Sequence, residues 1–446
     1  MSYISNTDKE RKIMLKEIGV ESFEELTEYI PKDLRVKGLL NLDKPMSELE
    51  LIRKFNALGK KNKTSLDVNS FLGGGVYDHF TPAAVDHITL RPEFHSAYTP
   101  YQAEVSQGTL QFIYEFQTMI CELTGMETAN AGMYDGATAA AEAVLMSVRN
   151  CKNKKMKAVI AGSINPEYLN VIKVYTEGAG IELDTVPQKN GLVDLDYLKK
   201  ATDENTACVL LQTPNFFGNT EDVFAAEKIA HSIPKTLFIV SCNPVSLALL
   251  NSPAEFKADI VTGEGQSLGN SQNFGGPLFG FFATSSKLSR QMPGRIAGGT
   301  VDQDGKRAYA LTLQAREQHI RRAKATSNIC SNQSLCTLAA VTHLSLMGSE
   351  GLIEAATQST TKAHYLAQKI AAIDGYELAF DAPFFNEFVM KTRKPVKEII
   401  AALKEKNIFA GIDLTENGLK DHLLIAVTEK KSKEQMDEFA KALAEV

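Results

Sequence analysis

Apolar residues recur at two different periods along the middle of the chain. Residues 106–125 carry apolar side chains at helical spacing and end at Gly125, and residues 136–150 follow with a second helical pattern. Beyond them, short β-branched runs alternate with further helical patterns. These runs, each predicted as a strand, are 157–162, 181–186, 207–212, 236–241, 259–263 and 278–283. The alternation predicts an α/β fold whose mostly parallel sheet is covered by helices on both faces.

The two ends of the chain show other patterns. Residues 1–64 are polar and helical, and capping boxes begin at Ser22 and Ser47. Because this segment is too small to form a hydrophobic core of its own, we expect it to pack on the main body or on a partner. The C-terminal pattern predicts a helix, a strand, a helix and a strand, at 334–371, 384–391, 395–406 and 425–428. The predicted domains are an N-terminal helical arm, a large α/β domain and a small α+β domain, at 1–64, 65–330 and 331–446.

Composition removes several classes of protein. The 48 basic and 54 acidic residues give a net charge of −6, which argues against binding of nucleic acid through its phosphates. No apolar run of about 18 residues occurs, so no membrane span is expected. The first twenty residues mix both charges, so no secretory signal is expected either. Six cysteines without a Cys-x-x-Cys pair argue against a disulfide framework or a zinc site, and we expect a cytoplasmic protein.

The start of the helix predicted over 136–150 is the first candidate for ligand chemistry. Gly136, Ala137 and Thr138 are small residues that would expose backbone N–H groups, and Thr138 adds a hydroxyl. A helix N-terminus of this kind favours an anion such as phosphate. The alternative is an ordinary buried helix start that is rich in alanine.

A Gly-rich connection over residues 263–277 is the second candidate. In one large group of pyridoxal-phosphate enzymes, the lysine that binds the cofactor follows a strand at such a place. Residues 258–286 contain neither lysine nor arginine, and a Schiff base requires an amine. Taken alone, the segment is therefore interpreted as a structural connection.

The third candidate is a long loop, residues 71–105, that is dense in Gly, Pro, Tyr and His. Loops of this length inside a compact domain are usually functional. Its most polar and aromatic part holds the candidate site residues Tyr98, Thr99, Tyr101, Gln102 and Glu104. A surface loop with packed tyrosines is the alternative.

Two further groups of polar residues carry weaker signals. His79, His87 and His95 recur every eight residues, which is not a ligand spacing, so no metal site is expected. The basic cluster 316–324 is typical of a solvated helix face, with anion binding as the alternative.

Several stretches together resemble one family, the glycine-cleavage P-protein, also called glycine dehydrogenase (decarboxylating). The stretches are YTPYQAEVSQGTLQ (98–111), GMYDGATAAAEA (132–143), MPGRIAG (292–298) and QAREQHIRRAKATSNIC (314–330). The resemblance implies an aminotransferase-like fold, fold type I of the pyridoxal-phosphate-dependent transferases. Members of the family are either long chains with two homologous halves or pairs of subunits. The length and the motifs fit the N-terminal half, which is subunit 1, or the alpha subunit.

The chain departs from a complete cofactor site of this family at two places. The position of the cofactor-binding lysine falls near Gln266, and the place of the acidic partner of the pyridine nitrogen reads Ser241-Cys242-Asn243. The helix start at Gly136, Ala137 and Thr138 is then a vestigial phosphate cup. The resemblance implies that pyridoxal phosphate sits on subunit 2, close to the interface between the two chains.

The loop is expected to be this chain's contribution to that shared site. The resemblance implies that residues 98–104 approach the active site of the partner, and residues 73–75, all glycine, would let the preceding segment come close to the partner backbone. Aromatic rings could pack near the cofactor, and polar groups could position the substrate or exclude water.

The implied activity is decarboxylation of glycine together with subunit 2, followed by transfer of the aminomethyl group to the lipoyl arm of the H-protein. A two-plus-two heterotetramer is the assembly that the family suggests. The alternatives are an autonomous pyridoxal-phosphate lyase or transferase that uses another lysine, a scaffold subunit without a catalytic role, and a regulatory binding module.

Overall fold

A computed structural model describes residues 6–38 and 40–446 of the chain. Residues 1–5 and 39 belong to the predicted N-terminal arm, and that part of the prediction lies outside the described residues. None of the described helices is long and apolar enough to cross a membrane.

The chain divides into two compact units, Met1–Lys63 and Thr64–Val446. The helices of the first unit are α1 (Asp8–Ile18), α2 (Phe23–Leu26), η1 (Lys32–Leu34) and α3 (Glu48–Gly59). The predicted capping boxes at Ser22 and Ser47 are confirmed, since each hydroxyl accepts from the third helical N–H and each glutamate there accepts from the cap. No side chain of α1, α2 or α3 is buried. Packing of this unit on the main body or on a partner stays a prediction.

A seven-stranded sheet forms the centre of the second unit, in the order β2-β10-β9-β8-β7-β3-β4. Its strands are β2 (Thr128–Ala129), β3 (Lys157–Ala161), β4 (Glu182–Val186), β7 (Thr206–Gln212), β8 (Leu237–Ser241), β9 (Ile260–Glu264) and β10 (Gly280–Thr284). From β9 to β4 all neighbours are parallel, and only β10 runs antiparallel to its neighbours. The predicted mostly parallel sheet is confirmed, and each predicted run overlaps one of its strands.

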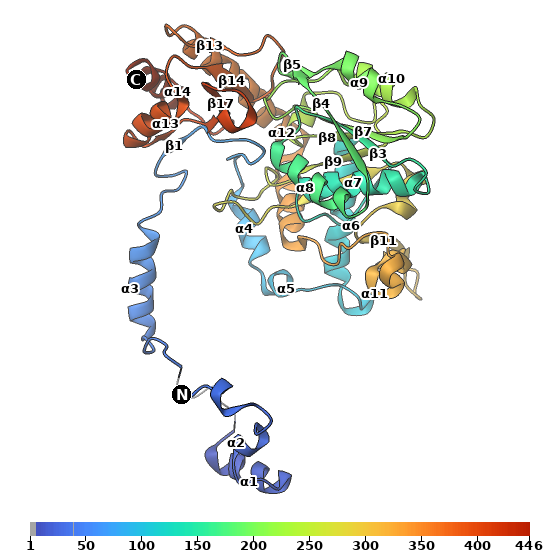
Figure 1. Ribbon diagram of the computed structural model, residues 1–446, viewed down its shortest axis with the longest axis vertical. Coiled ribbons are helices and arrows are strands. Elements are labelled where there is room, and N and C mark those ends of the chain that lie inside the picture. Colours follow the sequence, from blue (N-terminus) through green and yellow to red (C-terminus); the bar gives the residue numbers. More distant parts are fainter. Residues whose placement is uncertain (1–5, 39) are drawn as a thin grey trace. The chain divides into compact units, whose positions relative to one another are not determined.

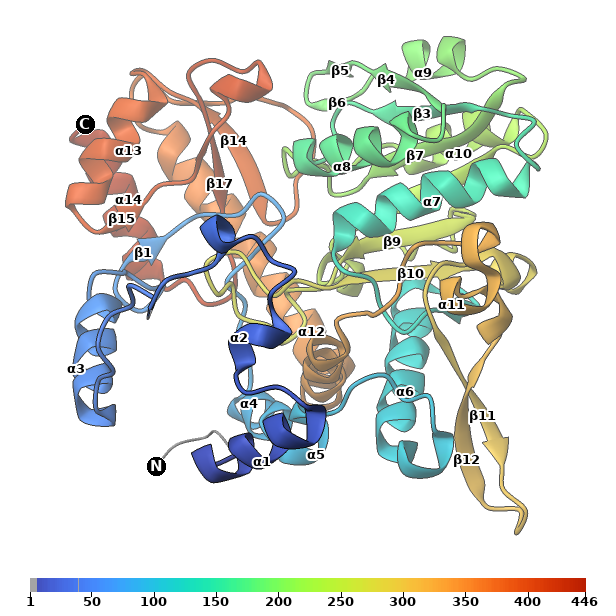
Figure 2. The same ribbon diagram turned by 60° about the horizontal axis from the view of Figure 1, so that its bottom comes forward.

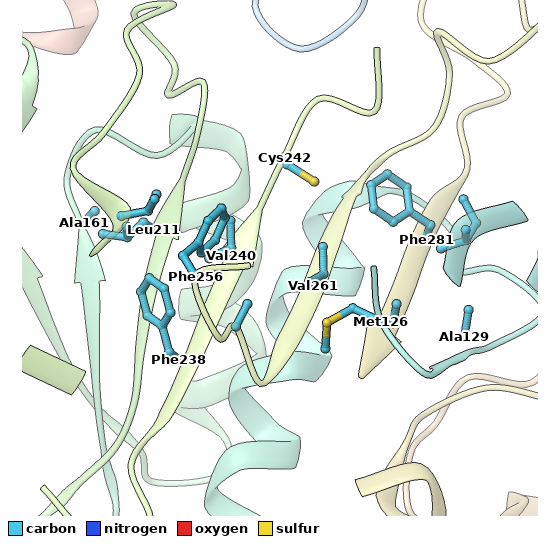
Figure 3. Close-up of a cluster of buried hydrophobic side chains, with 14 of the residues drawn as sticks. Met126, Ala129, Ala161, Leu211, Phe238, Val240, Cys242, Phe256, Val261 and Phe281 are labelled. Carbon is cyan, nitrogen blue, oxygen red and sulfur yellow. The ribbon is translucent and has the colours of Figure 1, made fainter. Parts of the chain in front are cut away.

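Helices cover both faces of this sheet (Figure 1). One face packs on α7 (Gly136–Asn150) and α8 (Pro166–Glu177), and the other on α6 (Gln107–Thr124), α9 (Leu195–Ala201), α10 (Val223–His231) and the start of α12 (Ser334–Ala371). Successive strand residues point to opposite faces. In β8, Phe238 and Val240 belong to the α6 layer, whereas Leu237 and Ile239 belong to the α7 layer. Figure 3 shows Phe238 and Val240 among the buried side chains of their layer.

A second, four-stranded sheet lies in the C-terminal part, in the order β13-β14-β17-β16. Its elements are β13 (Glu377–Leu378), β14 (Glu387–Lys391), α13 (Val396–Glu405), β16 (Ile412–Asp413), β17 (His422–Ala426) and α14 (Lys433–Ala444). Helix α12 serves both sheets, since its first half packs on the large core and its second half on this smaller one. It bends at Gly348, whose φ of 61° favours glycine. The predicted helices 334–371 and 395–406 and the strand 384–391 are confirmed.

The segments that join these layers include several that the sequence patterns do not predict. The antiparallel hairpin β11 (Ile296–Val301) and β12 (Arg307–Thr312) extends beyond the large sheet (Figure 2). Short elements complete the unit: β1 (Asn69–Ser70), α4 (Ala83–Thr89), α5 (Pro92–His95), β5 (Gln188–Lys189), β6 (Leu192–Val193), α11 (Gln318–Arg321) and β15 (Ile408–Phe409). Strand β1 pairs with β15, so the segment that enters the second unit joins the C-terminal part first. The division at 64 and 330 stays a prediction.

Candidate functional site

The carboxyl ends of the central parallel strands surround a small cavity. Open α/β sheets bind ligands at this edge. The lining side chains come from the strand ends, from α8 and from the C-terminal sheet, and include Gln212, Ser241, Cys242, Asn243, Glu264, Tyr168, Asn386 and Glu387. The cavity measures about 30 Å³. That volume holds about one water molecule, whereas cofactor sites take about 300 Å³ or more.

The start of α7 lies beside Glu264, which lines this cavity, and carboxyl groups of the chain itself bind two of its N–H groups. Asp135 Oδ1 accepts from the N–H of Thr138 at 2.7 Å, and Glu264 Oε2 accepts from the N–H of Gly136 at 2.9 Å. The Thr138 hydroxyl donates to the carbonyl of Asp135. Of the predicted cup residues Gly136, Ala137 and Thr138, two therefore already donate to carboxyl groups of the same chain.

Glu264 is held from three directions. Besides Gly136, the N–H groups of Gln266 and Phe279 donate to its Oε1, both at 3.1 Å. Burial raises the pKa of Glu264 to about 8, although these three donors act in the opposite direction. A Cβ atom added at Gly136 would lie 2.2 Å from the hydroxyl of Tyr168. The space beside the helix start is therefore filled by Glu264 and Tyr168.

Gln266 lies near the expected lysine position, and its side-chain amide is hydrogen-bonded to backbone groups of the same chain. Its Oε1 accepts from the N–H of Tyr77 at 2.9 Å, and its Nε2 donates to the carbonyl of Tyr77 at 3.0 Å. The same Nε2 donates to the carbonyl of Asn270 at 2.7 Å. The side chain is 1% exposed. Gln266 thus pairs with both backbone groups of one residue, as a neighbouring strand would.

The segment that Gln266 holds runs over residues 73–80, which we call the strap. Glu387 binds its first half, because Oε1 accepts from the N–H of Gly74 at 2.7 Å and Oε2 accepts from the hydroxyl of Tyr77 at 2.8 Å. Burial raises the pKa of Glu387 to about 7. Asn165 Nδ2 donates to the carbonyl of Gly74 at 2.9 Å. The strap is irregular in conformation, but side chains bind several of its backbone groups.

The second half of the strap is bound to the end of the C-terminal sheet. Thr428 donates to the carbonyl of Asp78 at 2.8 Å, and Glu429 Oε2 lies 2.7 Å from His79 Nδ1. The N–H of Phe80 donates to the other oxygen of Glu429. Burial alone would raise the pKa of Glu429, but these hydrogen bonds lower it to about 2. The strap therefore ties both sheets together across the cavity.

The glycines at the start of the strap allow close packing inside this chain. A Cβ atom at Gly73 would lie 2.3 Å from Glu387 Oε1 and 2.4 Å from the Cβ of Ala426. Gly75 has a φ of 108°, and a Cβ there would lie 2.9 Å from Asn165 Nδ2. The approach of this segment to a partner backbone stays a prediction.

The other predicted site residues lie apart from this cavity, on the loop before α6. Tyr98, Tyr101, Gln102 and Glu104 are exposed and Thr99 is half-buried. Tyr98 is 81% exposed and its hydroxyl lies 3.4 Å from Ser331 Oγ. The loop thus presents aromatic and polar side chains on the surface of the unit.

Tyr101 is anchored by residues for which the sequence analysis assigned no role. Arg295 Nη2 donates to its hydroxyl at 3.2 Å, and the guanidinium carbon lies 5.3 Å from the ring centroid. Glu317 Oε2 lies 3.5 Å from Arg295 Nε, and the His319 ring packs edge-on against Tyr101. Three of the motifs that carry the resemblance, 98–111, 292–298 and 314–330, therefore meet here. Arg295 and Glu317 both lie in motifs that carry the family resemblance, and this was the sequence signal that could have pointed to them.

A surface hollow of about 560 Å³ lies beside Tyr101. Its lining residues are Tyr101, Glu317, Gln318, His319, Arg322, Ala323, Ile329 and Cys330. Within the basic cluster, His319, Arg321, Arg322 and Lys324 are exposed. Arg316 instead donates to the carbonyl groups of Met292 and Gly294. The hollow is thus rimmed by aromatic and basic side chains.

The sheet order and the position of the cleft define the class of protein. The structure of a sphingosine-1-phosphate lyase from Burkholderia pseudomallei superposes with a TM-score of 0.67 at 14% identity over 92% of both chains. The fold is fold type I of the pyridoxal-phosphate-dependent transferases, as the resemblance implies.

More specific comparisons identify the family. The family model for the glycine cleavage system P-protein matches residues 1–443. A relative from Chloroherpeton thalassium, named a probable glycine dehydrogenase (decarboxylating) subunit 1, is 51% identical over all of both chains. A crystal structure of the glycine decarboxylase (P-protein) of the glycine cleavage system in inhibitor-bound form matches with a TM-score of 0.91 and 39% identity, over all of both chains. The chain belongs to the glycine cleavage system P-protein family, which confirms the predicted resemblance.

Pyridoxal phosphate, the cofactor of this fold class, does not fit the residues of this chain. The cavity at the strand ends is about one-tenth of the needed volume. The helix start donates to Glu264, and the position near the expected lysine holds Gln266, whose amide is bound to the strap.

Replacing Gln266 by leucine should destabilise the second unit. The N–H and the carbonyl of Tyr77 would lose their partner in a buried place, and each such group costs about 1–3 kcal/mol. We expect the free energy of unfolding to fall by about 3 kcal/mol in urea titrations of the purified chain. Gln272→Leu is the matched control, since Gln272 Nε2 makes one 3.3 Å bond to the strap at Val76. Equal losses for the two variants would contradict this role of Gln266.

The buried carboxyl group of Glu264 should make stability depend on pH. Its pKa is about 8 in the folded protein against an ordinary 4.5, so the folded chain binds more protons between these values. The stability that this group contributes is therefore full below pH 4.5 and is lost as pH rises toward 8. We expect the wild type to lose stability relative to Glu264→Gln between about pH 5 and about pH 8 in chemical denaturation. Parallel pH profiles would refute the assignment.

Proposed function

We propose that this chain is subunit 1 of a two-subunit glycine dehydrogenase (decarboxylating) and that it shapes a shared active site without binding pyridoxal phosphate itself. The observation that carries the proposal is the filled cleft, in which Glu264 occupies the helix start and about 30 Å³ remains. The cofactor is then held by subunit 2. Relatives that are named subunit 1 support the need for such a second subunit.

The reaction of the complete enzyme follows from this assignment. Glycine loses its carboxylate as CO₂, a step for which pyridoxal phosphate supplies an electron sink. The electron pair of the broken C–C bond forms a bond from the methylene carbon to one sulfur of the oxidised lipoyl arm of the H-protein. The S–S bond breaks, and the second sulfur takes up a proton. Atoms and electrons balance without a further oxidant.

The part of this chain in that reaction is assigned to the loop residues Tyr98, Thr99, Tyr101, Gln102 and Glu104. Two exposed tyrosines offer apolar surface that can cover a neighbouring site. Excluding water from that site matters, because a carbanion at the methylene carbon would otherwise be protonated. The assembly is a two-plus-two heterotetramer, in which each loop faces a subunit 2.

The compartment assigned to the enzyme is the cytoplasm. All six cysteines are free, which suits a reducing environment.

An autonomous pyridoxal-phosphate enzyme is disfavoured by the same filled cleft. Another lysine would have to reach a cavity that holds about one water molecule. A scaffold subunit, by contrast, differs from our proposal only in the role of the loop. The loop is therefore the place to test it.

Replacing Tyr98 and Tyr101 together by alanine should impair the complete enzyme. We expect the exchange of the glycine carboxyl group with bicarbonate, measured with subunit 2 and H-protein present, to fall on the order of 100-fold. The chain itself should still fold, because Tyr98 is 81% and Tyr101 49% exposed, and assembly of the complex is measured in parallel. Tyr197→Ala, which removes a partly exposed tyrosine from α9, is the matched control and should leave exchange unchanged. Normal assembly with unchanged exchange in the double variant would make the chain a scaffold.

A further inference from the structure

The segment before strand β11 is held unusually firmly. Over residues 292–295, four successive carbonyl groups each accept a hydrogen bond. The donors, in chain order, are Arg316 Nη1, Asn130 Nδ2, Arg316 Nη2 and the N–H of Ala131. Arg316 is itself half-buried, and burial lowers its pKa. The backbone of Arg295 is therefore fixed on both sides before its side chain begins.

The side chain of Arg295 is buried and points at the loop. It is 7% exposed, and Glu317 lies beside it as a counter-ion at 3.5 Å. A buried guanidinium needs such a partner, since an unpaired charge is costly to bury. Its remaining contact is Tyr101, through a 3.2 Å hydrogen bond to the hydroxyl and a guanidinium carbon 5.3 Å from the ring centroid. The planar guanidinium can make both contacts at once.

Tyr101 thus contacts the buried Arg295 on one side, and its other side is exposed to solvent. The ring is 49% exposed and lines the surface hollow together with His319 and Arg322. Tyr98 differs, because it is 81% exposed and its hydroxyl has only a 3.4 Å contact with Ser331. Of the two tyrosines, only Tyr101 contacts a buried charged side chain.

We propose that Arg295 is a positioning residue that sets the ring of Tyr101 for the shared active site. Arg316 holds the carbonyl groups of Met292 and Gly294 beside Arg295, and Glu317 lies 3.5 Å from the guanidinium as its counter-ion. Arg295 acts through Tyr101 and does not touch the reacting atoms. The inference rests on the proposed function, in which Tyr101 reaches the site of subunit 2. Positioning matters because a displacement of about 1 Å can lower a rate on the order of 100-fold.

The test compares Arg295→Gln in three backgrounds within the complete complex with H-protein. In the wild-type background we expect kcat for glycine exchange to fall about tenfold with KM for glycine changed less than twofold. In the Tyr98→Ala background the same tenfold loss should recur. In the Tyr101→Ala background the substitution should add nothing, since the residue through which it acts is gone. Arg307→Gln, which removes an exposed arginine 5.9 Å from another tyrosine ring, is the matched control and should have no effect.

A second readout does not depend on activity. The chain contains no tryptophan, so Tyr101→Trp provides a single fluorescent reporter in the purified full-length chain. Adding Arg295→Gln should lower the fluorescence anisotropy of this reporter, because the indole loses its inner contact. Arg295→Lys retains the charge next to Glu317 and guards against misfolding. It should assemble like the wild type but regain only part of the exchange rate, since lysine lacks the planar group.

The outcomes separate the two proposals. If Tyr101→Ala leaves exchange unchanged, the loop is structural and the proposed function fails with it. If Tyr101→Ala lowers exchange but Arg295→Gln and Arg295→Lys do not, only the positioning role is overturned. A full tenfold loss from Arg295→Gln in the Tyr101→Ala background, or an unchanged anisotropy, overturns it as well.

Discussion

The carboxyl group of Glu264 binds the start of helix α7, and the rest of the site depends on this contact. It accepts the first free N–H of α7, and it also accepts from Gln266 and Phe279 on either side of the Gly-rich connection. A helix start that would suit a phosphate is thus satisfied by the chain itself. With this position filled and Gln266 bound to the strap, the fold retains the layers of a cofactor enzyme but has no room for the cofactor.

The strap connects the two sheets across the cavity at the strand ends. Its two carboxyl partners lie in different environments. Burial raises the pKa of Glu387 to about 7, whereas hydrogen bonds lower that of Glu429 to about 2. Hydrogen bonds therefore favour the ionised form of Glu429, whereas burial favours the protonated form of Glu387.

The sequence predicts the repeating layers well and the irregular contacts poorly. Periodicity identified the central strands and α6, α7 and α12, because each buries one face. It missed the β11–β12 hairpin, whose first strand contains small residues and little apolar alternation. The sequence shows directly that no lysine lies near Gln266. It does not show the contact of Glu264 with Gly136, because these residues are 128 positions apart in the chain. Arg295 and Tyr101 lie 194 residues apart, so only folding brings them together.

The most direct test of the account is a binding titration of pyridoxal phosphate against the purified chain, without subunit 2, for the wild type and for Gln266→Lys. Visible absorbance of a lysine-bound cofactor, and its fixation by borohydride, would report binding. The account predicts neither signal for either protein, because restoring an amine does not empty a cavity of about 30 Å³ or free the start of α7. Stoichiometric, borohydride-fixable binding by the wild-type chain, or by Gln266→Lys, would contradict it.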